Sequence, residues 1–422
     1  MSRLSIFLSL LLTASGCSTL FPGNNTSTGS STPVGCDSTA TKHVAPGGYY
    51  VVGNTVCTAG GEAHLFHGVD RPSLEWSPTG DMLSASDFQL MSADWKANVV
   101  RIALNQDFWL PESPFASSTY QATVDAAVKW AEQAGMDVIL DLHWSDAGVL
   151  GGCNGGCQEL MADTNSIMFW SQVAAIYKND GRVLFELYNE PHDIPWPVWQ
   201  SGGMTSAGWT AAGMQQLYDA VRAAGAENLV IAGGVDYAYD LTGVPQYRIN
   251  GYNVLYATHP YGGDPTKGGA PEKQPQQWDS HWGFLTQTDP VIVTEFGDSV
   301  DCGSDTKVDA YTSALITYSD QHSASWTAWA WYTGGCSFPS IIGDWNGTPT
   351  PVGMVVQTAL QGYSEPAPGG KRDGGVTAAG GSGGAQGAAG AGGGGAAGAG
   401  GNGAQDGGAA GGPGGGSAGA AG

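Results

Sequence analysis

Basic residues are scarce in this chain. Its 422 residues include 15 lysines and arginines against 38 aspartates and glutamates, which gives a formal net charge of −23 at pH 7. Nucleic acids and anionic membrane surfaces are bound by basic faces, and this composition does not supply one. We therefore expect no nucleic-acid partner, whereas a neutral partner such as a glycan meets no such penalty. An acidic surface that merely keeps an exported protein soluble explains the same charge equally well.

The apolar run at the N-terminus is too short to span a bilayer. It covers Leu4–Leu12, follows Arg3, and leads into Thr13–Cys17 (TASGC), which is the pattern of an export signal. Small residues directly before a cysteine resemble a bacterial lipobox, although Ala14 stands where leucine is usual. We expect residues 1–17 to be a signal with Cys17 as its lipidation site, and a plain secretory signal is the alternative. The protein is then secreted or lipid-anchored at the bacterial cell envelope, and it meets the membrane only through that anchor.

Cysteines are few, and their number fits an exported chain. There are seven, and setting Cys17 aside leaves an even set of six. Six cysteines allow 15 pairings, so the sequence alone does not fix connectivity. Proximity along the chain favours two short-range disulfides and leaves a third pair: Cys36–Cys57, Cys153–Cys157 and Cys302–Cys336. A metal site at Cys153 and Cys157 is the alternative, but no second cluster of ligands lies nearby, so we expect no metal.

Both ends of the chain lack the residues that build a core. Residues 18–35 are rich in Ser, Thr, Asn and Gly, and they are expected to form a flexible linker. Residues 366–422 are almost entirely Gly and Ala without aromatic side chains, so we expect a disordered tail. The glycines keep no three-residue period, which excludes collagen. The folded domain is therefore expected at residues 36–365.

Between these ends, short apolar segments alternate with helical patterns. The expected strands are His64–Arg71, Asn98–Leu104, Asp137–Trp144, Arg182–Pro191, Leu229–Val235, Val254–Tyr261, Val291–Asp298 and Ser325–Tyr332. The expected helices are Ser84–Lys96, Tyr120–Gly135, Asn165–Lys178, Trp209–Gly225, Gln276–Gln287, Lys307–His322 and Pro351–Gly362, with the weakest helical pattern near Gln246.

This alternation predicts an α/β fold of the (β/α)₈ TIM-barrel type. Nearly continuous apolar strands are typical of a parallel sheet that is buried on both faces. Eight such strands, each followed by a crossover, fit a closed barrel. A doubly wound open sheet is the alternative, but the glycine-rich phosphate loop that usually follows its first strand is missing after His67-Gly68-Val69.

Polar or aromatic residues occupy the carboxyl ends of six predicted strands, where barrels place their active sites. These residues are Arg101, His143-Trp144, Asn189-Glu190-Pro191, His259-Pro260-Tyr261, Glu295-Phe296-Gly297 and Trp329-Ala330-Trp331. A single charge at a strand end is usually a solvated terminus. Six strands that converge on one face are better explained by a site.

Glu190 and Glu295 follow the fourth and seventh strands, which lie on opposite sides of an eight-stranded barrel. Cleavage of a glycosidic bond needs one protonated carboxyl beside the leaving oxygen and one ionised carboxylate beside the anomeric carbon. Carboxyl groups about 5–5.5 Å apart give retention of configuration, and a wider gap gives inversion. Arg101, by charge and hydrogen bonding, and the Tyr261 hydroxyl could keep one glutamate ionised.

The motifs around these glutamates, NEP after the fourth strand and TEFG after the seventh, resemble glycoside hydrolase family 5, the cellulase-type family. The resemblance covers residues 44–363. It implies that Glu190 is the acid/base, Glu295 the nucleophile and Arg101 the support of that nucleophile. It further implies sugar-binding or supporting roles for Asn189, His143, His259 and Tyr261, and a place for Trp331 in the floor of the −1 subsite.

Other polar and aromatic residues have structural interpretations beside the functional one. Glu186 lies inside its strand and is better read as a buried partner than as a catalyst, and Asp141 could orient His143 or satisfy the core. Four tryptophans could stack on sugar rings or pack in the core: Trp76, Trp109, Trp144 and Trp345. Of these, Trp144 and Trp109 are our candidates for subsite aromatics.

The function implied by the resemblance is a retaining β-glycanase without a cofactor. We expect a monomer that cleaves a β-1,4-linked polysaccharide, foremost a cellulose-type β-glucan, by double displacement. β-Mannanases, xyloglucanases and exo-acting relatives share the same eight residues, so these substrates stay open. A transglycosylase and a non-catalytic sugar-binding surface lipoprotein are the alternatives of other classes.

Overall fold

The computed structural model describes residues 35–36, 43–262, 271–297, 310–335 and 338–364. Within them, eight parallel strands form a barrel in the order β10-β11-β12-β3-β4-β5-β6-β9. The barrel is closed because β9 pairs with β10. The barrel strands are β3 His67–Arg71, β4 Val99–Asn105, β5 Asp137–Trp144, β6 Val183–Glu186, β9 Val230–Gly233, β10 Val254–Thr258, β11 Val291–Val293 and β12 Ser325–Ala328. The predicted (β/α)₈ barrel is confirmed.

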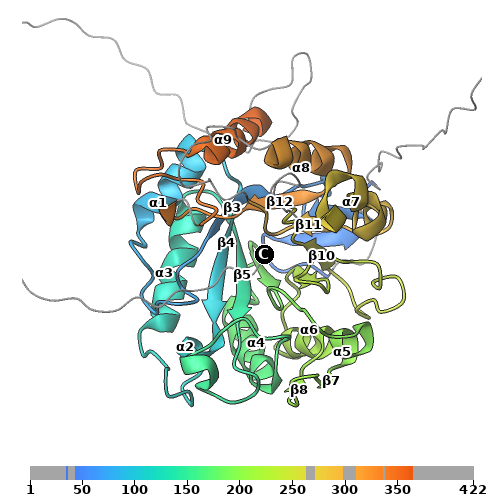
Figure 1. Ribbon diagram of the computed structural model, residues 1–422. Coiled ribbons are helices and arrows are strands. Elements are labelled where there is room, and N and C mark those ends of the chain that lie inside the picture. The colour runs from blue at the N-terminus through green and yellow to red at the C-terminus, as the bar shows by residue number, and fades with distance from the viewer. Residues whose placement is uncertain (1–34, 37–42, 263–270, 298–309, 336–337, 365–422) are drawn as a thin grey trace, which may run out of the picture.

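Helices surround the strands on the outside of the barrel (Figure 1). They are α1 Ala85–Gln89, continued by a π-helical turn at Leu90–Asp94, α2 Gln106–Trp109, α3 Tyr120–Gln133, α4 Thr164–Tyr177, α5 Trp196–Ser201, α6 Met214–Ala223, α7 Pro275–His281, α8 Ala310–Gln321 and α9 Pro351–Ser364. Short 3₁₀ turns lie at Gly152–Asn154, Pro271–Lys273 and Gly283–Gln287. None of the helices in the described part is long and apolar enough to cross a membrane.

Alternation along each strand separates the inside of the barrel from the outside. On β4, Val100, Ile102 and Leu104 belong to the large core beneath the helices, whereas Val99 belongs to a second apolar cluster inside the barrel. Successive side chains of a strand point to opposite faces, so Arg101 shares the inward face with Val99. The barrel interior is therefore apolar at the amino ends of the strands and becomes charged toward their carboxyl ends.

A β-hairpin that the sequence did not predict lies at the amino end of the barrel. Its strands are β1 Tyr49–Val52 and β2 Thr55–Thr58, which pair antiparallel. Val56 of β2 joins the apolar cluster inside the barrel, and the next residue, Cys57, forms the expected disulfide with Cys36. The hairpin thus covers the end of the barrel that is remote from the charged carboxyl ends.

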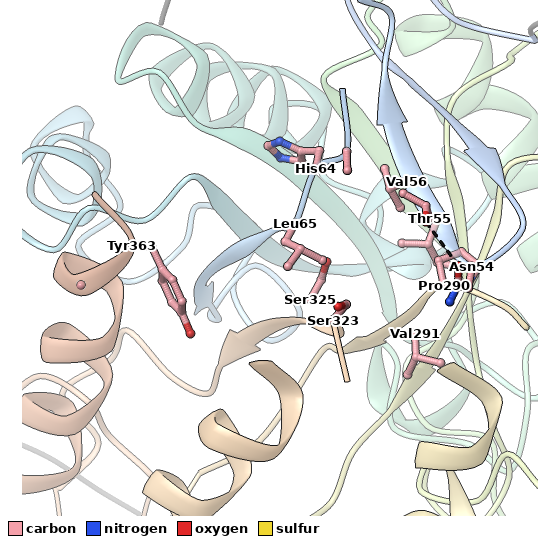
Figure 2. A pocket seen from close by; sticks show the side chains of 13 residues that line it. Asn54, Thr55, Val56, His64, Leu65, Pro290, Val291, Ser323, Ser325 and Tyr363 are labelled. Carbon is pink, nitrogen blue, oxygen red and sulfur yellow. Dashed lines mark hydrogen bonds between the residues drawn. The ribbon is translucent and has the colours of Figure 1, made fainter. Parts of the chain in front are cut away.

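Beside this hairpin lies a hollow of about 680 Å³. Figure 2 shows Asn54 and Thr55 of the hairpin on one side of it and His64 and Tyr363 on others. Ser325, at the first position of β12, also lines it, which places the hollow at the amino ends of the strands. It is therefore separate from the carboxyl ends where the predicted catalytic residues lie.

Several elements differ from expectation. The segment near Gln246 forms turns rather than a helix, because Gly243 and Pro245 both disfavour one. The helix expected at Trp209–Gly225 begins only at Met214, since Thr210–Ala211 (β8) pairs with Gly203–Met204 (β7) in a small hairpin. The helix expected at Gln276–Gln287 is split into α7 and a 3₁₀ turn.

Candidate active site

Arg101 stands at the centre of a buried charged cluster at the carboxyl end of the barrel. Its guanidinium lies 2.5 Å from Glu186, 2.7 Å from Glu295, 3.0 Å from Asp141 and 3.9 Å from Asp70. Ionising all four buried carboxyl groups around one cation is unfavourable, because burial and like charges both disfavour the charged form. Burial accordingly raises the pKa of Asp70 and Glu186, and it raises that of Asp141 to about 7, against the opposing charge of Arg101.

Glu295 follows β11 and receives a hydrogen bond on each of its two carboxylate oxygens. Arg101 donates from Nη1 to Oε1 at 2.7 Å, and the Tyr261 hydroxyl donates to Oε2 at 3.1 Å. Both partners are donors, so they stabilise negative charge on this carboxylate. With 6 % of its side chain exposed, Glu295 is held in one orientation yet remains reachable.

Glu190 follows β6 and has a different environment. His259 Nδ1 lies 2.9 Å from its Oε1, and the Gln158 amide donates to its Oε2. Burial raises the pKa of the Glu190 carboxyl above its ordinary value, although the hydrogen bond from Gln158 opposes this. A raised pKa keeps a carboxyl protonated at higher pH, which is what a general acid needs.

The two glutamates face each other across a short gap. Carboxylate oxygens of Glu190 and Glu295 and a ring nitrogen of His259 all lie within 4.8 Å of one another. A pair of carboxyl groups this close matches the spacing of retaining glycosidases better than the wider spacing of inverting ones.

His143 and Asn189 complete the wall of the site. His143 Nδ1 lies 2.7 Å from Asp141 Oδ2, its Nε2 lies 3.4 Å from the Asn189 amide nitrogen, and Asn189 Oδ1 accepts from Arg101 at 2.8 Å. Burial lowers the pKa of His143 to about 4, so the ring is neutral at neutral pH. The structure therefore brings Arg101 and all the predicted polar residues into one continuous network.

The expectation for Trp331 is wrong. Its side chain is fully buried and packs edge-on against Trp95, with ring centroids 5.0 Å apart, so it cannot form a subsite floor. Trp329 instead stacks on His143 at 5.3 Å with nearly parallel rings and keeps 8 % of its surface exposed. β12 ends at Ala328, so the alternation that would put residues 329 and 331 on one face does not extend to them.

Of the other candidate tryptophans, one is buried and three are partly exposed. Trp109 is 2 % exposed and packs edge-on against Phe169 and Tyr120, so this subsite candidate is also wrong. Trp144 ends β5 and is partly exposed, as are Trp76 and Trp345. These three keep a surface on which a ligand could stack.

Sequence reasoning missed four residues of the site. Asp70 lies on β3, Glu75 is buried just after it, Thr294 immediately precedes Glu295, and Gln158 contacts Glu190 from the loop after β5. Gln158 carried a signal, because it directly follows Cys157 in an insertion after the third predicted strand, and Thr294 is the first residue of the TEFG motif. Asp70 and Glu75 lie in segments that no sequence pattern connected with catalysis.

Two disulfides are present in the described residues, as proximity along the chain predicted: Cys36–Cys57 and Cys153–Cys157. The third predicted pair, Cys302–Cys336, lies outside the described residues. The Cys153–Cys157 bridge lies directly before Gln158 in the same loop.

Among the residues that the structure describes, two groups each bring together three side chains of the kinds that bind metal ions. Glu190, His259 and Glu295 form one, and Cys153, Cys157 and Glu159 form the other. In the first set, each carboxylate already accepts hydrogen bonds from protein donors, with which a cation would have to compete. In the second, the two sulfurs are bonded to each other and are not thiolate ligands. The arrangement fits proton transfer and nucleophilic attack by carboxyl groups better than metal binding.

Comparison with known families agrees with this geometry. Residues 54–335 match the family described as cellulase (glycosyl hydrolase family 5). The chain belongs to this family. The matched residues span the barrel from the β1–β2 hairpin to the loop after β12, so they contain both glutamates. The chain is thus a glycoside hydrolase of family 5.

The similar proteins are distant. The chain is 24 % identical over 318 residues to endoglucanase MaCel5A of Microbulbifer sp. (strain ALW1), which covers 72 % of this chain and 56 % of that protein. It is 23 % identical over 278 residues to endoglucanase N of Pectobacterium atrosepticum, which covers 64 % of this chain and 54 % of that one. The chain therefore spans about half the length of these relatives.

Solved structures share the fold. The β-glucanase SdGluc5_26A of Saccharophagus degradans, in complex with cellotetraose, superposes with a TM-score of 0.62 at 23 % identity, covering 79 % of this chain and 98 % of that one. The catalytic domain of Thermobifida fusca endoglucanase Cel5A superposes with a TM-score of 0.58 at 18 % identity, covering 75 % and 97 %. At such identities the likeness establishes the barrel alone.

Proposed function

We propose that this protein is an endo-β-1,4-glucanase that hydrolyses β-glucan with retention of anomeric configuration. The observation that carries the proposal is the pair of glutamates within 4.8 Å of each other, one held by donors and the other with a raised pKa. The endoglucanases among the distant relatives, and the cellotetraose complex of the S. degradans β-glucanase, support β-glucan as the substrate.

In the first step, Glu295 attacks the anomeric carbon while Glu190 gives its proton to the leaving oxygen. The glycosidic C–O bond breaks, a glycosyl ester forms on Glu295, and Glu190 becomes ionised. Arg101 and Tyr261 hold the nucleophile in place. The Asn189 side chain, fixed by Arg101 at 2.8 Å, lies ready to bind the sugar 2-hydroxyl.

In the second step, Glu190 acts as the base. It takes a proton from a water molecule, the hydroxide oxygen bonds to the anomeric carbon, and the ester bond to Glu295 breaks. Two inversions give net retention. Water is the only co-reactant, and it enters in the second step.

Glu295→Ala and Glu190→Ala test the assignment. Each should lose nearly all hydrolysis of soluble β-glucan while circular dichroism and thermal unfolding show a folded protein. With an activated aryl β-glycoside, which needs no acid to leave, added azide should restore turnover of Glu190→Ala and give the β-glycosyl azide. Substantial glucanase activity in a folded Glu295→Ala protein contradicts the proposal.

The substrate is tested with a panel of β-glucan, mannan and xyloglucan, followed by product chromatography. Endo action on β-glucan gives a ladder of oligosaccharides, and NMR of the earliest product should show the β anomer. Faster cleavage of mannan would make the protein a β-mannanase of the same family. Products longer than the substrate, formed with excess acceptor, would indicate transglycosylation, and binding without cleavage would indicate a sugar-binding lipoprotein.

We further propose that the protein is exported, with Cys17 as a lipid anchor. The disulfides Cys36–Cys57 and Cys153–Cys157 support an oxidising compartment. Expression in a bacterium with radiolabelled palmitate should label the wild type in the membrane fraction and leave Cys17→Ala unlabelled. Secretion of unlabelled wild-type protein would favour a plain signal peptide.

A further inference from the structure

A chain of hydrogen bonds runs from Glu190 into the barrel behind the nucleophile. Glu190 Oε1 lies 2.9 Å from His259 Nδ1, and His259 Nε2 lies 2.9 Å from Thr294 Oγ1. The Thr294 hydroxyl lies 2.7 Å from Glu186 Oε1, and Glu186 Oε2 accepts from Arg101 Nε at 2.5 Å. Thr294 and Glu186 are fully buried and His259 is 1 % exposed, so solvent does not interrupt the chain.

We propose that Glu186 and Thr294 are positioning residues for the acid/base: they hold His259 with its proton on Nε2, so that Nδ1 accepts a hydrogen bond from protonated Glu190. The inference rests on the proposed role of Glu190. It gives Glu186, which sequence reasoning treated as a buried partner, a part in catalysis through His259.

Only two arrangements of protons satisfy this chain, because a neutral imidazole has one donor and one acceptor and a hydroxyl has one proton. Burial lowers the pKa of His259 to about 4, so the ring is neutral at neutral pH. In one arrangement Glu186 is ionised, Thr294 donates to it, His259 donates from Nε2, and Glu190 carries the proton. In the other arrangement all directions are reversed, so Glu186 carries the proton and Glu190 is ionised.

Charge decides between the two arrangements. A negative charge on Glu186 lies 2.5 Å from the Arg101 guanidinium. A negative charge on Glu190 would receive a hydrogen bond from the neutral Gln158 amide, but it would lie beside a neutral imidazole and within 4.8 Å of the Glu295 carboxylate, where like charges repel. Burial raises the pKa of Glu186 as it does those of Asp141 and Asp70. The contact with Arg101 distinguishes Glu186, because it is 2.5 Å long, against 3.0 Å for Asp141 and 3.9 Å for Asp70. The first arrangement therefore holds in the free enzyme.

The same tautomer serves both chemical steps. Before glycosylation, the Nδ1 lone pair keeps the proton on Glu190 until the leaving oxygen takes it. Afterwards, the ionised Glu190 faces that lone pair with no proton between them, which makes the carboxylate a stronger base toward water. Glu186 and Thr294 do not touch the reacting atoms and act through His259.

Two nearly isosteric variants should reverse the tautomer. In Glu186→Gln the amide oxygen keeps the bond from Arg101, so its NH₂ faces Thr294, which must then donate to His259 Nε2. In Thr294→Val the Nε2 proton has no acceptor. Both changes favour His259 with its proton on Nδ1, donating to Glu190 and stabilising the ionised form. At high pH, kcat/KM falls as Glu190 loses its proton, and this fall is the basic limb of the pH profile. The limb should therefore move at least about one pH unit lower in both variants.

The experiment measures kcat/KM against pH on soluble β-glucan for wild type, Glu186→Gln, Thr294→Val, Thr294→Ser and Thr258→Val. Thr294→Ser restores the hydroxyl and should restore the wild-type limb. Thr258→Val removes a buried hydroxyl that donates to the Tyr239 carbonyl and should leave the limb in place. An activated aryl β-glycoside, which needs no acid, should show no such shift.

Nitrogen-15 NMR of labelled histidine reads the tautomer directly. The His259 signals, assigned with a His259→Gln variant, should show a proton on Nε2 in wild type and on Nδ1 in Glu186→Gln and Thr294→Val. A proton on Nδ1 of His259 in the wild type overturns the inference. A limb that shifts in Glu186→Gln but not in Thr294→Val also overturns it, because the limb would then respond to the lost charge of Glu186 and not to the tautomer of His259.

Other ionisable groups interact with Glu190 or His259, and they are left unchanged in all the variants compared: Glu295, Arg101, Asp141, His143, Tyr237, Tyr261 and Lys273.

The Glu190→Ala variant distinguishes a wrong acid/base assignment from a wrong positioning role. If it keeps its activity on β-glucan and its basic limb, the proposed acid/base is wrong. If it loses both while Glu186→Gln and Thr294→Val retain the wild-type limb, only the positioning role is wrong.

Discussion

Arg101 satisfies more partners than a lysine could. Its planar guanidinium donates to Glu186 from Nε, to Glu295 from Nη1 and to Asn189 from Nη2, and it is fully buried. A single ammonium group has no fixed fork of donors and cannot reach three sides of the cluster at once. Arg101 therefore orients Glu295, Asn189 and Glu186 together, which are the proposed nucleophile, sugar-binding residue and positioning residue.

Arg101→Lys should consequently lower kcat/KM on β-glucan by about 100-fold or more, the usual effect of removing one preorganised electrostatic contact. It should also lower the free energy of unfolding by about 3 kcal/mol, because buried carboxylates lose their partner. Urea unfolding and steady-state kinetics measure the two effects. Arg182→Lys is the matched control, since Arg182 pairs with Asp137 at the amino end of the barrel. Wild-type kinetics in Arg101→Lys would contradict the role.

At this scale, the sequence could predict residues whose position follows from a strand and a short motif. Glu190 and Glu295 directly follow apolar strands, so their place at the carboxyl face required only the barrel. Trp331 failed because its direction depends on the backbone after β12, which no longer alternates. Glu75 could not be found, because its burial beside the site results from packing of a loop that carries no periodic pattern.

At the scale of elements, the loop after β5 positions a side chain that contacts Glu190. Its Cys153–Cys157 disulfide closes the segment directly before Gln158, whose amide donates to Glu190. Gly156 lies where a β-carbon would approach the Asn105 side chain to 2.7 Å, and Asn105 donates to the Gly155 carbonyl at 2.7 Å. The loop is thus fixed against the barrel, and it holds Gln158 at Glu190, the proposed acid/base.

Gln158→Leu should move the basic limb of the kcat/KM profile upward. The amide stabilises the ionised carboxylate and so lowers the pKa of Glu190; without it that pKa rises. A hydrogen bond to a charged group contributes about 1.5–3 kcal/mol, which corresponds to about one pH unit or more. This direction is opposite to that expected for Thr294→Val, so one assay separates the two contacts.

A double Cys153→Ser, Cys157→Ser variant should shift the limb in the same upward direction but by less, because Gln158 is still present on a looser loop. Gln172→Leu removes an amide of the same size that accepts from Trp109 Nε1 at 3.1 Å and serves as the control. A limb that stays fixed in Gln158→Leu, or that falls, would remove Gln158 from the acid/base environment.

Barrel strands and long helices could be predicted because burial imposes a period on them. β5 and α4 were found nearly to the residue. The β1–β2 hairpin was missed because its strands have four residues each and it is stabilised by Val56 in the barrel interior and by the Cys36–Cys57 bridge. Contacts of that kind become visible only once the barrel exists.

The whole molecule should lose stability as pH rises above neutrality. Burial raises the pKa of Asp141 to about 7 and those of Asp70 and Glu75 well above their ordinary values. In the unfolded chain these carboxyls are ionised at neutral pH, so the native state binds more protons. The unfolding free energy then falls with rising pH by about 1.4 kcal/mol per pH unit for each proton that only the native state holds.

The histidines oppose this trend only at lower pH. Burial lowers the pKa of His67 to about 3 and those of His143 and His259 to about 4. These groups contribute stability that is present above their ordinary pKa of about 6.5 and lost as pH falls toward 4. Above pH 7 they are neutral in both states. The interval from pH 7 to 8.5 therefore isolates the buried carboxyls.

Urea unfolding at pH 7, 7.5, 8 and 8.5 measures the slope, and Glu75→Gln identifies one of its sources. Glu75 accepts from the Ser73 backbone at 2.7 Å, and a glutamine can keep that bond while removing the titrating group. The variant should show a slope shallower by up to one proton, whereas Glu62→Gln, on an exposed carboxyl, should match the wild type. An unfolding free energy that is constant or rises over this interval would show that Asp70, Glu75 and Asp141 are ionised in the native barrel. Arg101 would then be balancing four negative charges, and the preference for a charge on Glu186 over Glu190 would lose its electrostatic basis.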